Sequence, residues 1–466
     1  MAVLACVSLA ARGLATQGTE PTPAQQPAPA PQRTPAQQKM AWAEKTIQAS
    51  PGKFQAYNQL ALALVRRVRE TSDPAYYSQA EEAVSQSLRL RPDNFEALKI
   101  QVSIMLGRQE FSQALERARA LNRRAPDDVP VYGYTAEAEI ALGDYDDAEN
   151  AAQWMLDLRP GNVAGLVEGA WLRRLYGDIE GAVDFLNQAY QQTPPSEVEE
   201  TAWLLTQMAD VQLKAGKVDV AASLLDRALG VFPGYYAALE GLAQVRTARG
   251  QYAEALDAVR ERNRNLPTLA SLYQLAQALE RSGRADEAGA AYADFEDRAR
   301  RELERGGHAS RELIFYYAGH ARKPAEALRI ARREVLWRHD VFTLDADAWA
   351  LYVNAQYTEA ETQMNKALSV GIRDGEFFYH AGQIASKLGN QAQAASYLKE
   401  SLDLGYLPEL RKAAREALES LGPASAVASS AKRKAGDNRE WSPHPRPLSR
   451  KGRGGEREAV GEGGRG

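Results

Sequence analysis

Alanine recurs in this sequence about every 34 residues, and this period constrains the fold more than any other feature. Successive intervals are 34, 34, 34, 39, 34, 33, 39, 33 and 34 residues. The positions are Ala80, Ala114, Ala148, Ala182, Ala221, Ala255, Ala288, Ala327, Ala360 and Ala394. Prolines follow the same period at Pro92, Pro126, Pro160, Pro194, Pro233 and Pro267. Such a period is typical of stacked helical hairpins, so the sequence predicts an all-α solenoid.

Segment 129–162 shows how one repeat is expected to fold. Two stretches with helical spacing of apolar residues are joined at Gly143, and the second stretch ends at Pro160. Glycine readily adopts the left-handed conformation that ends a helix, and proline cannot continue one. Small side chains at Ala136 and Ala148 would let the two helices cross closely. We therefore expect each repeat to be a helix-turn-helix hairpin.

Two insertions interrupt the period. The first repeat is long, which indicates about two extra helical turns near Val65–Asp73. A second insertion lies at 195–197, just before the repeat that contains Ala209.

These residues resemble the tetratricopeptide repeat family. Small residues at the eighth and twentieth positions, an aromatic residue at the seventeenth and a proline at the thirty-second carry the resemblance. The tryptophan usual at the fourth position is replaced by Leu98, Tyr132, Leu166, Leu205, Leu239 and Leu272. The resemblance covers about Lys39 to Leu421. It implies a right-handed superhelix whose first helices line a concave groove that binds peptides or partner proteins.

The array divides the chain into three expected regions. Residues 1–38 are expected to hold a candidate signal segment and a disordered linker rich in Pro, Ala and Gln. Residues 39–421 would form a solenoid of about ten repeats with capping helices at its ends. Residues 422–466 are expected to be a disordered basic tail rich in Gly, Arg and Pro, because this composition cannot bury a core.

The N-terminus suggests export. Ala2 to Ala11 has the length of a signal-peptide core, although no basic segment precedes it. The alternative is a small apolar tail without a role. Val3 to Cys6 also matches a loose lipoprotein cleavage box, which would place a lipid anchor on Cys6, and this is the less favoured alternative. We predict a periplasmic or secreted protein, with a cytoplasmic location as the alternative.

Charge argues against nucleic acid as a partner. The formal net charge of −4 combines +5 in residues 421–466 with −9 in the rest of the chain. An acidic body is unsuited to general phosphate-backbone binding, which needs clustered Lys and Arg. No apolar run approaches the ~18 residues of a membrane-spanning helix.

The C-terminal tail indicates a bacterial source, because Ser442 to Glu456 resembles translated copies of a dispersed repeat found between bacterial genes. The alternative is that the tail is a basic arm for nucleic acid or anionic lipid.

Motifs for catalysis, cofactors and metals were not found in the sequence. The five histidines show no HExxH motif and no paired ligand spacing, and Cys6 is the single cysteine. No glycine-rich phosphate loop follows a strand pattern. We therefore expect no catalytic residue, no cofactor and no metal site, and the protein is predicted not to be an enzyme.

The resemblance implies which residues face the groove. Family geometry places the second, fifth, ninth, twelfth and thirteenth residues of each first helix on the concave side. These candidate partner-binding residues are Lys99, Ser103, Glu137, Trp171, Arg174, Thr206, Asp210, Lys214, Glu240, Gln244, Tyr273 and Gln277. Some family members grip a C-terminal carboxylate with Lys and Asn, but Lys99 is followed by Ser103 rather than Asn, so no such clamp is predicted.

Trp171 is the strongest single candidate for partner binding, since tryptophan and arginine dominate interface energetics. It lies three residues from Arg174 and shares a helix face with it. With Lys99 and Lys214 on the same predicted side, these residues would form a mixed aromatic and cationic stretch suited to an acidic peptide with an apolar anchor. The alternative is that Trp171 packs against the next hairpin as core.

The function predicted from these features is a non-catalytic scaffold of the bacterial cell envelope. It would bind a partner protein or peptide of unknown identity in the concave groove. The alternative is a regulatory or sensor subunit that controls a separately encoded enzyme.

Overall fold

The computed structural model describes residues 33–265, 267–304 and 311–422, which form helices joined by short turns and loops. The described ranges contain 22 α-helices and no strand. This confirms the predicted all-α repeat solenoid. The candidate signal segment with Cys6 and the basic tail lie outside the described residues.

The helices run in chain order with short connections. They are α1 (Pro35–Ala49), α2 (Phe54–Thr71), α3 (Ala75–Leu90), α4 (Phe95–Gly107), α5 (Phe111–Arg124), α6 (Val129–Leu142), α7 (Tyr145–Leu158), α8 (Val163–Leu175), α9 (Ile179–Gln192), α10 (Val198–Lys214), α11 (Val218–Val231), α12 (Tyr236–Ala248), α13 (Tyr252–Asn265), α14 (Leu269–Arg281), α15 (Ala285–Glu304), α16 (Arg311–Ala318), α17 (Pro324–Glu334), α18 (Val341–Val353), α19 (Tyr357–Ser369), α20 (Gly375–Lys387), α21 (Gln391–Leu404) and α22 (Pro408–Ser420).

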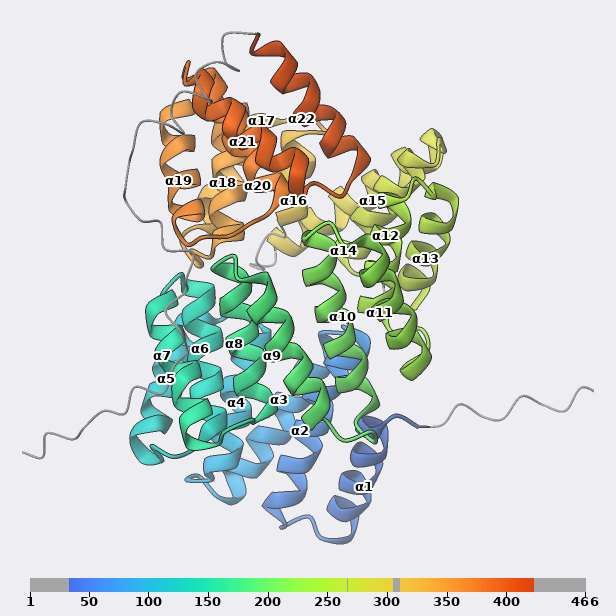
Figure 1. Cartoon of the computed structure of the whole chain (residues 1–466). Helices are drawn as coiled ribbons and strands as arrows, with labels where there is room; N and C mark the ends of the chain where they lie inside the picture. Colours follow the sequence, from blue (N-terminus) through green and yellow to red (C-terminus); the bar gives the residue numbers. More distant parts are fainter. Residues whose placement is uncertain (1–32, 266, 305–310, 423–466) are drawn as a thin grey trace, which may run out of the picture.

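Helices α2 to α21 pair into consecutive hairpins, and α1 and α22 are single helices at the two ends (Figure 1). Helix α1 begins at Pro35, four residues before the predicted start of the array at Lys39. Within the described ranges, no helix combines the length and the apolar composition that crossing a membrane requires.

The periodic alanines lie where the helices of each hairpin cross. Each of the ten exposes 3% or less of its surface, so there is no free space for a larger side chain. The first helices carry a small residue at the eighth position of each repeat, and on α20 this residue is Gly382. A Cβ atom added to Gly382 would lie 2.7 Å from Cγ of Leu398. The glycines between the helices have positive φ angles, for example +83° at Gly143, as the pattern predicted.

The solenoid turns tightly enough for distant hairpins to touch. The backbone amide of His339 donates a hydrogen bond of 3.1 Å to the carbonyl oxygen of Ala141. A Cβ atom added to Gly177 would lie 2.6 Å from the carbonyl oxygen of Gly371. Figure 1 shows α18 and α20 above α6 and α8, which agrees with these contacts.

One apolar cluster is built from both of these distant regions. It joins buried residues of α6 to α8 with buried residues of the segment 341–377. Members include Ile140, Leu172, Val341, Ile372 and Phe377. The core is therefore continuous between successive turns of the solenoid as well as between neighbouring hairpins.

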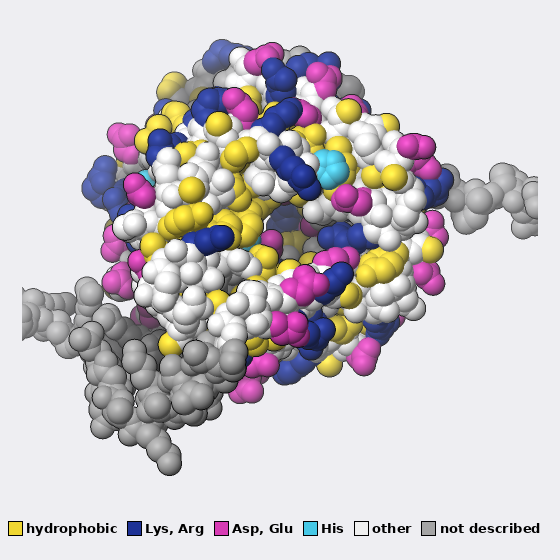
Figure 2. All heavy atoms as spheres, turned by 90° about the horizontal axis from the view of Figure 1, so that it is seen from above, with side chains coloured by type: hydrophobic (Ala, Val, Ile, Leu, Met, Phe, Trp, Pro, Cys, Tyr) yellow, Lys and Arg dark blue, Asp and Glu magenta, His cyan; other side chains and the backbone are white. Residues whose placement is uncertain are grey.

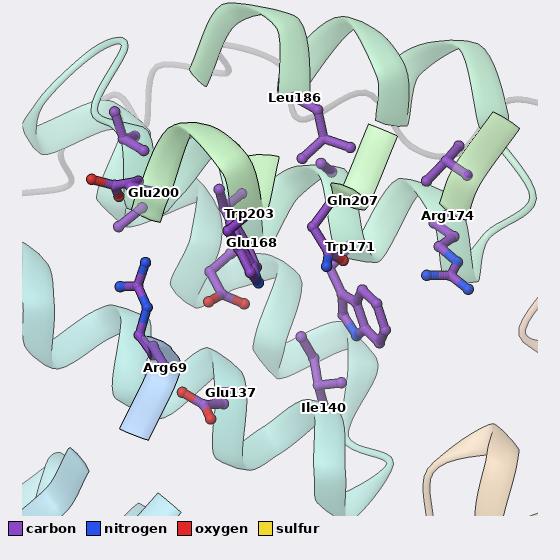
Figure 3. A pocket seen from close by; sticks show the side chains of 15 residues that line it. Arg69, Glu137, Ile140, Glu168, Trp171, Arg174, Leu186, Glu200, Trp203 and Gln207 are labelled. Atoms are coloured by element: carbon purple, nitrogen blue, oxygen red, sulfur yellow. The ribbon is translucent and has the colours of Figure 1, made fainter. Parts of the chain in front are cut away.

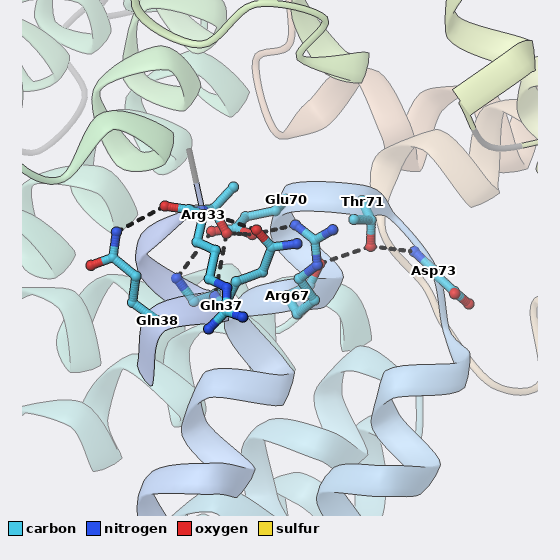
Figure 4. A network of polar contacts seen from close by, with 9 residues as sticks. Arg33, Gln37, Gln38, Arg67, Glu70, Thr71 and Asp73 are labelled. Atoms are coloured by element: carbon cyan, nitrogen blue, oxygen red, sulfur yellow. Dashed lines mark hydrogen bonds and ion pairs between the residues drawn. The ribbon is translucent and has the colours of Figure 1, made fainter. Parts of the chain in front are cut away.

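Helix α1 is fastened to the end of α2 by a buried carboxylate (Figure 4). Glu70 accepts hydrogen bonds from the hydroxyl of Thr34 at 2.6 Å and from the backbone amide of Ala36 at 3.4 Å. It also forms an ion pair with Arg67 at 2.6 Å. Thr34 forms a capping box with Gln37 at the start of α1. The first helix is thus held in place by polar contacts as well as by packing.

Figure 2 shows the molecule from above, with a hollow near the centre of this face. Apolar, basic and acidic side chains all gather around the hollow. The inner side of the solenoid is therefore chemically mixed rather than uniformly charged.

Candidate functional site

A cavity of about 580 Å³ lies among the first helices of several hairpins, and we call it the α8 cavity. Its walls come from α2, α6, α8, α9 and α10. The lining residues are Arg69, Glu137, Ile140, Val163, Ala164, Val167, Glu168, Ala170, Trp171, Arg174, Leu186, Glu200, Trp203, Gln207 and Val211. Its volume falls in the range of about 300–1,000 Å³ that is common for ligand sites.

Helix α8 supplies the largest part of the wall because its residues recur at helical spacing. Ala164, Val167, Trp171 and Arg174 are three or four residues apart, so they lie on one helix face. The side chain of Asn162 caps the helix by accepting a 2.7 Å hydrogen bond from the amide of Gly165. This cap fixes where α8 begins.

Helices α2 and α10 meet at the edge of the cavity through the two insertions. Arg66 and Arg69 on the extended α2 form ion pairs with Glu197 and Glu199 at the start of α10, and the Arg69 to Glu199 distance is 2.9 Å. The two inserted segments therefore connect hairpins that are about 130 residues apart. They close one side of the cavity.

Two partly exposed tryptophans face the cavity. The ring of Trp171 lies 6.3 Å from the ring of Phe342 on α18, and the guanidinium of Arg174 lies 5.0 Å from its centre. The guanidinium of Arg69 lies 6.0 Å from the ring of Trp203. Both side chains line the cavity (Figure 3).

Glu137 and Glu168 point into the same space between α6 and α8 (Figure 3). Burial raises the pKa of Glu168 to about 8, and the neighbouring Glu137 carboxylate adds to this rise. Burial within the concave wall raises the pKa of Glu137 to about 7, although part of its side chain contacts solvent. The smaller rise fits its greater exposure. No ion-pair partner of either carboxylate lies in the described ranges.

The two arginines of the cavity are already neutralised by the protein. Arg69 pairs with Glu199, and Arg174 pairs with Asp210 at 2.6 Å. Glu200, which also lines the cavity, forms no ion pair with a described residue. The ionisable groups of the wall that lack an ion-pair partner among the described residues are therefore all acidic.

Three of the predicted groove residues, Glu137, Trp171 and Arg174, line the α8 cavity together. Trp171 lines the cavity and is also packed against Phe342, as the alternative role considered for it implied. The sequence pattern did not single out Glu168 or Trp203.

The other predicted residues of the N-terminal hairpins are occupied elsewhere. Lys99 is buried and forms ion pairs with Asp128 at 2.8 Å and Glu96 at 2.9 Å. The hydroxyls of Ser103 and Thr206 donate hydrogen bonds to backbone carbonyls of their own helices.

Lys214 and Gln244 contact the C-terminal part of the solenoid. Lys214 forms a 3.0 Å ion pair with Asp374, and its ammonium lies 5.3 Å from the ring of Tyr406. The hydroxyl of Tyr406 donates a 3.4 Å hydrogen bond to Gln244. Each cation of the predicted stretch, Lys99, Arg174 and Lys214, is paired with a carboxylate of the protein, so none of the three is free to bind an acidic peptide.

The remaining candidates lie farther along the array. Glu240 pairs with Arg262 at 2.9 Å, and Asp210 is the partner of Arg174. Tyr273 packs against Phe295 at 5.1 Å. Gln277 lines a separate opening of about 390 Å³.

Two cavity residues that were not predicted could have been found from their positions in the repeat. Trp203 occupies the second position of its repeat, which is one of the groove positions, and Glu168 is one residue beyond the fifth position of its own. Arg69 had no such signal, because it reaches the cavity only through contact between distant hairpins.

A buried histidine pair lies outside the cavity. Nδ1 of His380 is 2.7 Å from a carboxylate oxygen of Asp345, and each side chain is only 4% exposed. Burial alone would lower the pKa of His380, but the attraction of Asp345 outweighs it and raises this pKa. Trp349 stacks on the imidazole at 4.2 Å. With so little exposure, we interpret the pair as part of the core. Among the described residues, no cluster of metal-ligating side chains is present.

The fold and the cavity define a solenoid of helical hairpins with a mixed aromatic and acidic pocket among its first helices. The tetratricopeptide repeat family model matches residues 135–197 and 206–265, which contain most of that pocket. The resemblance seen in the sequence is thus confirmed over these residues. No curated protein matches the sequence.

Several solved structures are similar to this chain. The APC/C hetero-tetramer Cut9-Hcn1 has 10% identity and a TM-score of 0.41, over 82% of this chain and 58% of that one. This chain therefore spans less than two thirds of the length of that protein. Yeast Tom70 has 13% identity and a TM-score of 0.35, over 81% and 99% of the two chains. The human IFIT1 dimer with PPP-AAAA has 13% identity and a TM-score of 0.45, over 78% and 87%.

Proposed function

We propose that this protein binds a segment of a partner protein in the α8 cavity and acts as a non-catalytic interaction scaffold. The tetratricopeptide fold commonly mediates protein–protein interaction, and the family match includes most of the residues that line the cavity, though not Arg69, Glu200 or Trp203. The observation that carries the proposal is the pair of partly exposed indoles, Trp171 and Trp203, in one concave site. Tryptophans in such pockets supply a large share of the binding energy at protein interfaces.

We place this function in a bacterial cell envelope. The apolar segment Ala2 to Ala11, the proline-rich stretch after it and the intergenic-type sequence at Ser442 to Glu456 support this location. Fractionation of the native host, with the protein detected by antibody, tests it. Recovery of the protein in the cytoplasm alone would contradict the proposed location.

A peptide-display selection on the intact protein tests cavity binding. Random peptides are selected on the wild type, and the affinity of the enriched peptides is then measured for single variants. Trp203→Ala should weaken binding by about 2 kcal/mol, or roughly thirtyfold, as loss of an interface anchor does. The matched control is Trp42→Ala, which removes a 56% exposed tryptophan from α1, outside the cavity lining.

Trp171→Ala should weaken binding similarly, but it also removes packing against Phe342 on α18. Its melting temperature must therefore be measured beside its affinity. Enriched peptides that bind both cavity variants as tightly as the wild type would overturn the proposed function.

A further inference from the structure

The lining of the α8 cavity has more acidic than basic groups free to act on a ligand. Arg69 and Arg174 are paired with Glu199 and Asp210 at 2.9 and 2.6 Å. Glu137, Glu168 and Glu200 have no ion-pair partner within the described ranges. A site of this kind attracts a positive charge and repels a negative one.

Because the two central carboxylates lie near each other, it is unfavourable to have both ionised without a bound cation. Glu137 and Glu168 both extend into the space between α6 and α8 (Figure 3). Glu168 is half-buried and Glu137 is exposed, and like charges held near each other raise the free energy of the empty ionised site. A ligand cation placed between them would remove part of this cost.

The rest of the lining suits a cation on an apolar stem. Trp171 and Trp203 line the cavity, and aromatic rings attract ammonium and guanidinium groups, as the guanidiniums of Arg174 and Arg69 near the two ring centres illustrate. Ile140, Val167 and Leu186 add an aliphatic surface along which methylene groups can lie. An acidic side chain would meet unpaired carboxylates, and a purely aliphatic side chain would leave both carboxylates without a partner.

We propose that the α8 cavity selects a lysine or arginine side chain of the partner segment, held by Glu137 and Glu168 against the indoles of Trp171 and Trp203. This inference rests on the proposed function and specifies its ligand. It replaces the acidic peptide expected from the sequence, because the cations that would have bound such a peptide are already paired.

The display selection described above provides the first test. Peptides that depend on Trp203 for binding should share a lysine or arginine, and replacing this residue with glutamine should weaken binding at least about tenfold. If the Trp203-dependent peptides instead share an acidic or aliphatic residue, the cationic specificity is overturned and the proposed function stands. If no selected peptide depends on Trp171 or Trp203, both fall.

A charge-matched pair of variants gives the second test with the best selected peptide. Glu137→Gln/Glu168→Gln removes the two cavity carboxylates, and Glu116→Gln/Glu180→Gln removes two exposed carboxylates on second helices. The cavity variant should lose at least about tenfold in affinity at pH 8, whereas the control should change by less than about twofold. Equal losses would mean general attraction to an acidic protein and would overturn the inference, as would unchanged affinity of the cavity variant.

Loss of folding cannot imitate the expected result. Glutamine keeps the shape of glutamate and removes two carboxylates that ionise unfavourably, so the melting temperature of the cavity variant at pH 8 should not fall. Reduced affinity together with retained melting assigns the effect to ligand recognition.

Discussion

The hydroxyl oxygen of Tyr145 at the start of α7 accepts a 2.9 Å hydrogen bond from the backbone amide of Val341 at the start of α18, across 196 residues of sequence. The first amides of a helix have no partner within the helix, so this phenol satisfies a donor that would otherwise be unpaired. Val341 is fully buried, and its side chain belongs to the apolar cluster shared by the two regions. Tyr145 therefore links two turns of the solenoid.

Tyr145→Phe should lower the free energy of unfolding by about 1–3 kcal/mol, because it leaves a buried amide without an acceptor. Urea unfolding followed by circular dichroism measures the change. Tyr252→Phe is the matched control, since Tyr252 begins α13 at the same repeat position and its hydroxyl makes no hydrogen bond to a described residue. Hydrogen exchange at the Val341 amide should become faster in the first variant alone. Equal stability losses in both variants would contradict the capping role.

Local features of the fold could be predicted from the sequence because they depend on neighbouring residues. The small residues at Ala148 and Ala182 follow from helices crossing within one hairpin, and the resemblance to the tetratricopeptide repeat family implied the placement of Glu137 and Trp171. The contact between Tyr145 and Val341 could not be predicted in this way. It depends on small rotations summed over many hairpins, whereas an ideal repeat array contacts only its neighbours.

The two insertions illustrate the same limit. Both were visible in the sequence, one as a long first repeat and one as the 39-residue interval between Ala182 and Ala221, but nothing in the sequence showed that Arg69 in one would meet Glu199 at the other. The predicted cationic stretch shows the same limit. The ion pair of Lys214 could not be foreseen, because its partner Asp374 comes from a hairpin 160 residues further along.

Ala148→Leu and Ala182→Leu should each destabilise the protein by about 1–3 kcal/mol through overpacking. Both alanines are completely buried at helix crossings, where three additional heavy atoms have no space. Gln188→Leu, at an exposed position of α9, is the matched control and should change the unfolding free energy by less than about 0.5 kcal/mol. Chemical denaturation of the three variants provides the comparison. Wild-type stability in both alanine variants would show that the repeat register is incorrect.

Lys214→Met should destabilise the protein by about 3 kcal/mol at neutral pH, because it leaves the largely buried Asp374 carboxylate without its cation. Burial acts to raise the pKa of Asp374, but Lys214 outweighs it and holds this pKa below its usual value. The pair therefore contributes stability above the unfolded pKa of about 4, and the contribution is lost as the pH falls through the lower native pKa.

The difference between Lys214→Met and wild type should consequently shrink when urea unfolding is repeated near pH 3. Lys217→Met serves as the control, because Lys217 is exposed and forms no ion pair with a described residue. A pH-independent difference would indicate that Lys214 acts through packing on Tyr406 rather than through its charge.

Binding of a lysine-containing peptide to the α8 cavity should strengthen as the pH rises from about 6 to about 9. Burial raises the pKa of Glu137 to about 7 and that of Glu168 to about 8, so both carboxylates gain their charge within this range. Free lysine keeps its charge up to a pKa of about 10.4, so the ligand does not change. The other charged groups at the wall are Arg69 on α2, Arg174 on α8 and Glu200 on α10.

The same pKa values determine whether the stability of the fold rises or falls with pH. Both native values lie above the unfolded value of about 4.3, so the stability that the protonated carboxylates provide is complete below that pH and is lost as the pH rises through about 7 to 8. Wild type should therefore lose stability relative to Glu137→Gln/Glu168→Gln over this interval, while its affinity for the peptide increases.

Titration calorimetry and urea unfolding at matched pH values measure the two trends. The glutamine variant should bind weakly with a flat pH profile, and Glu116→Gln/Glu180→Gln should follow the wild type. An affinity that instead declines with rising pH would mean that the protonated cavity is the binding form, as expected for an acidic ligand and not for a cationic one.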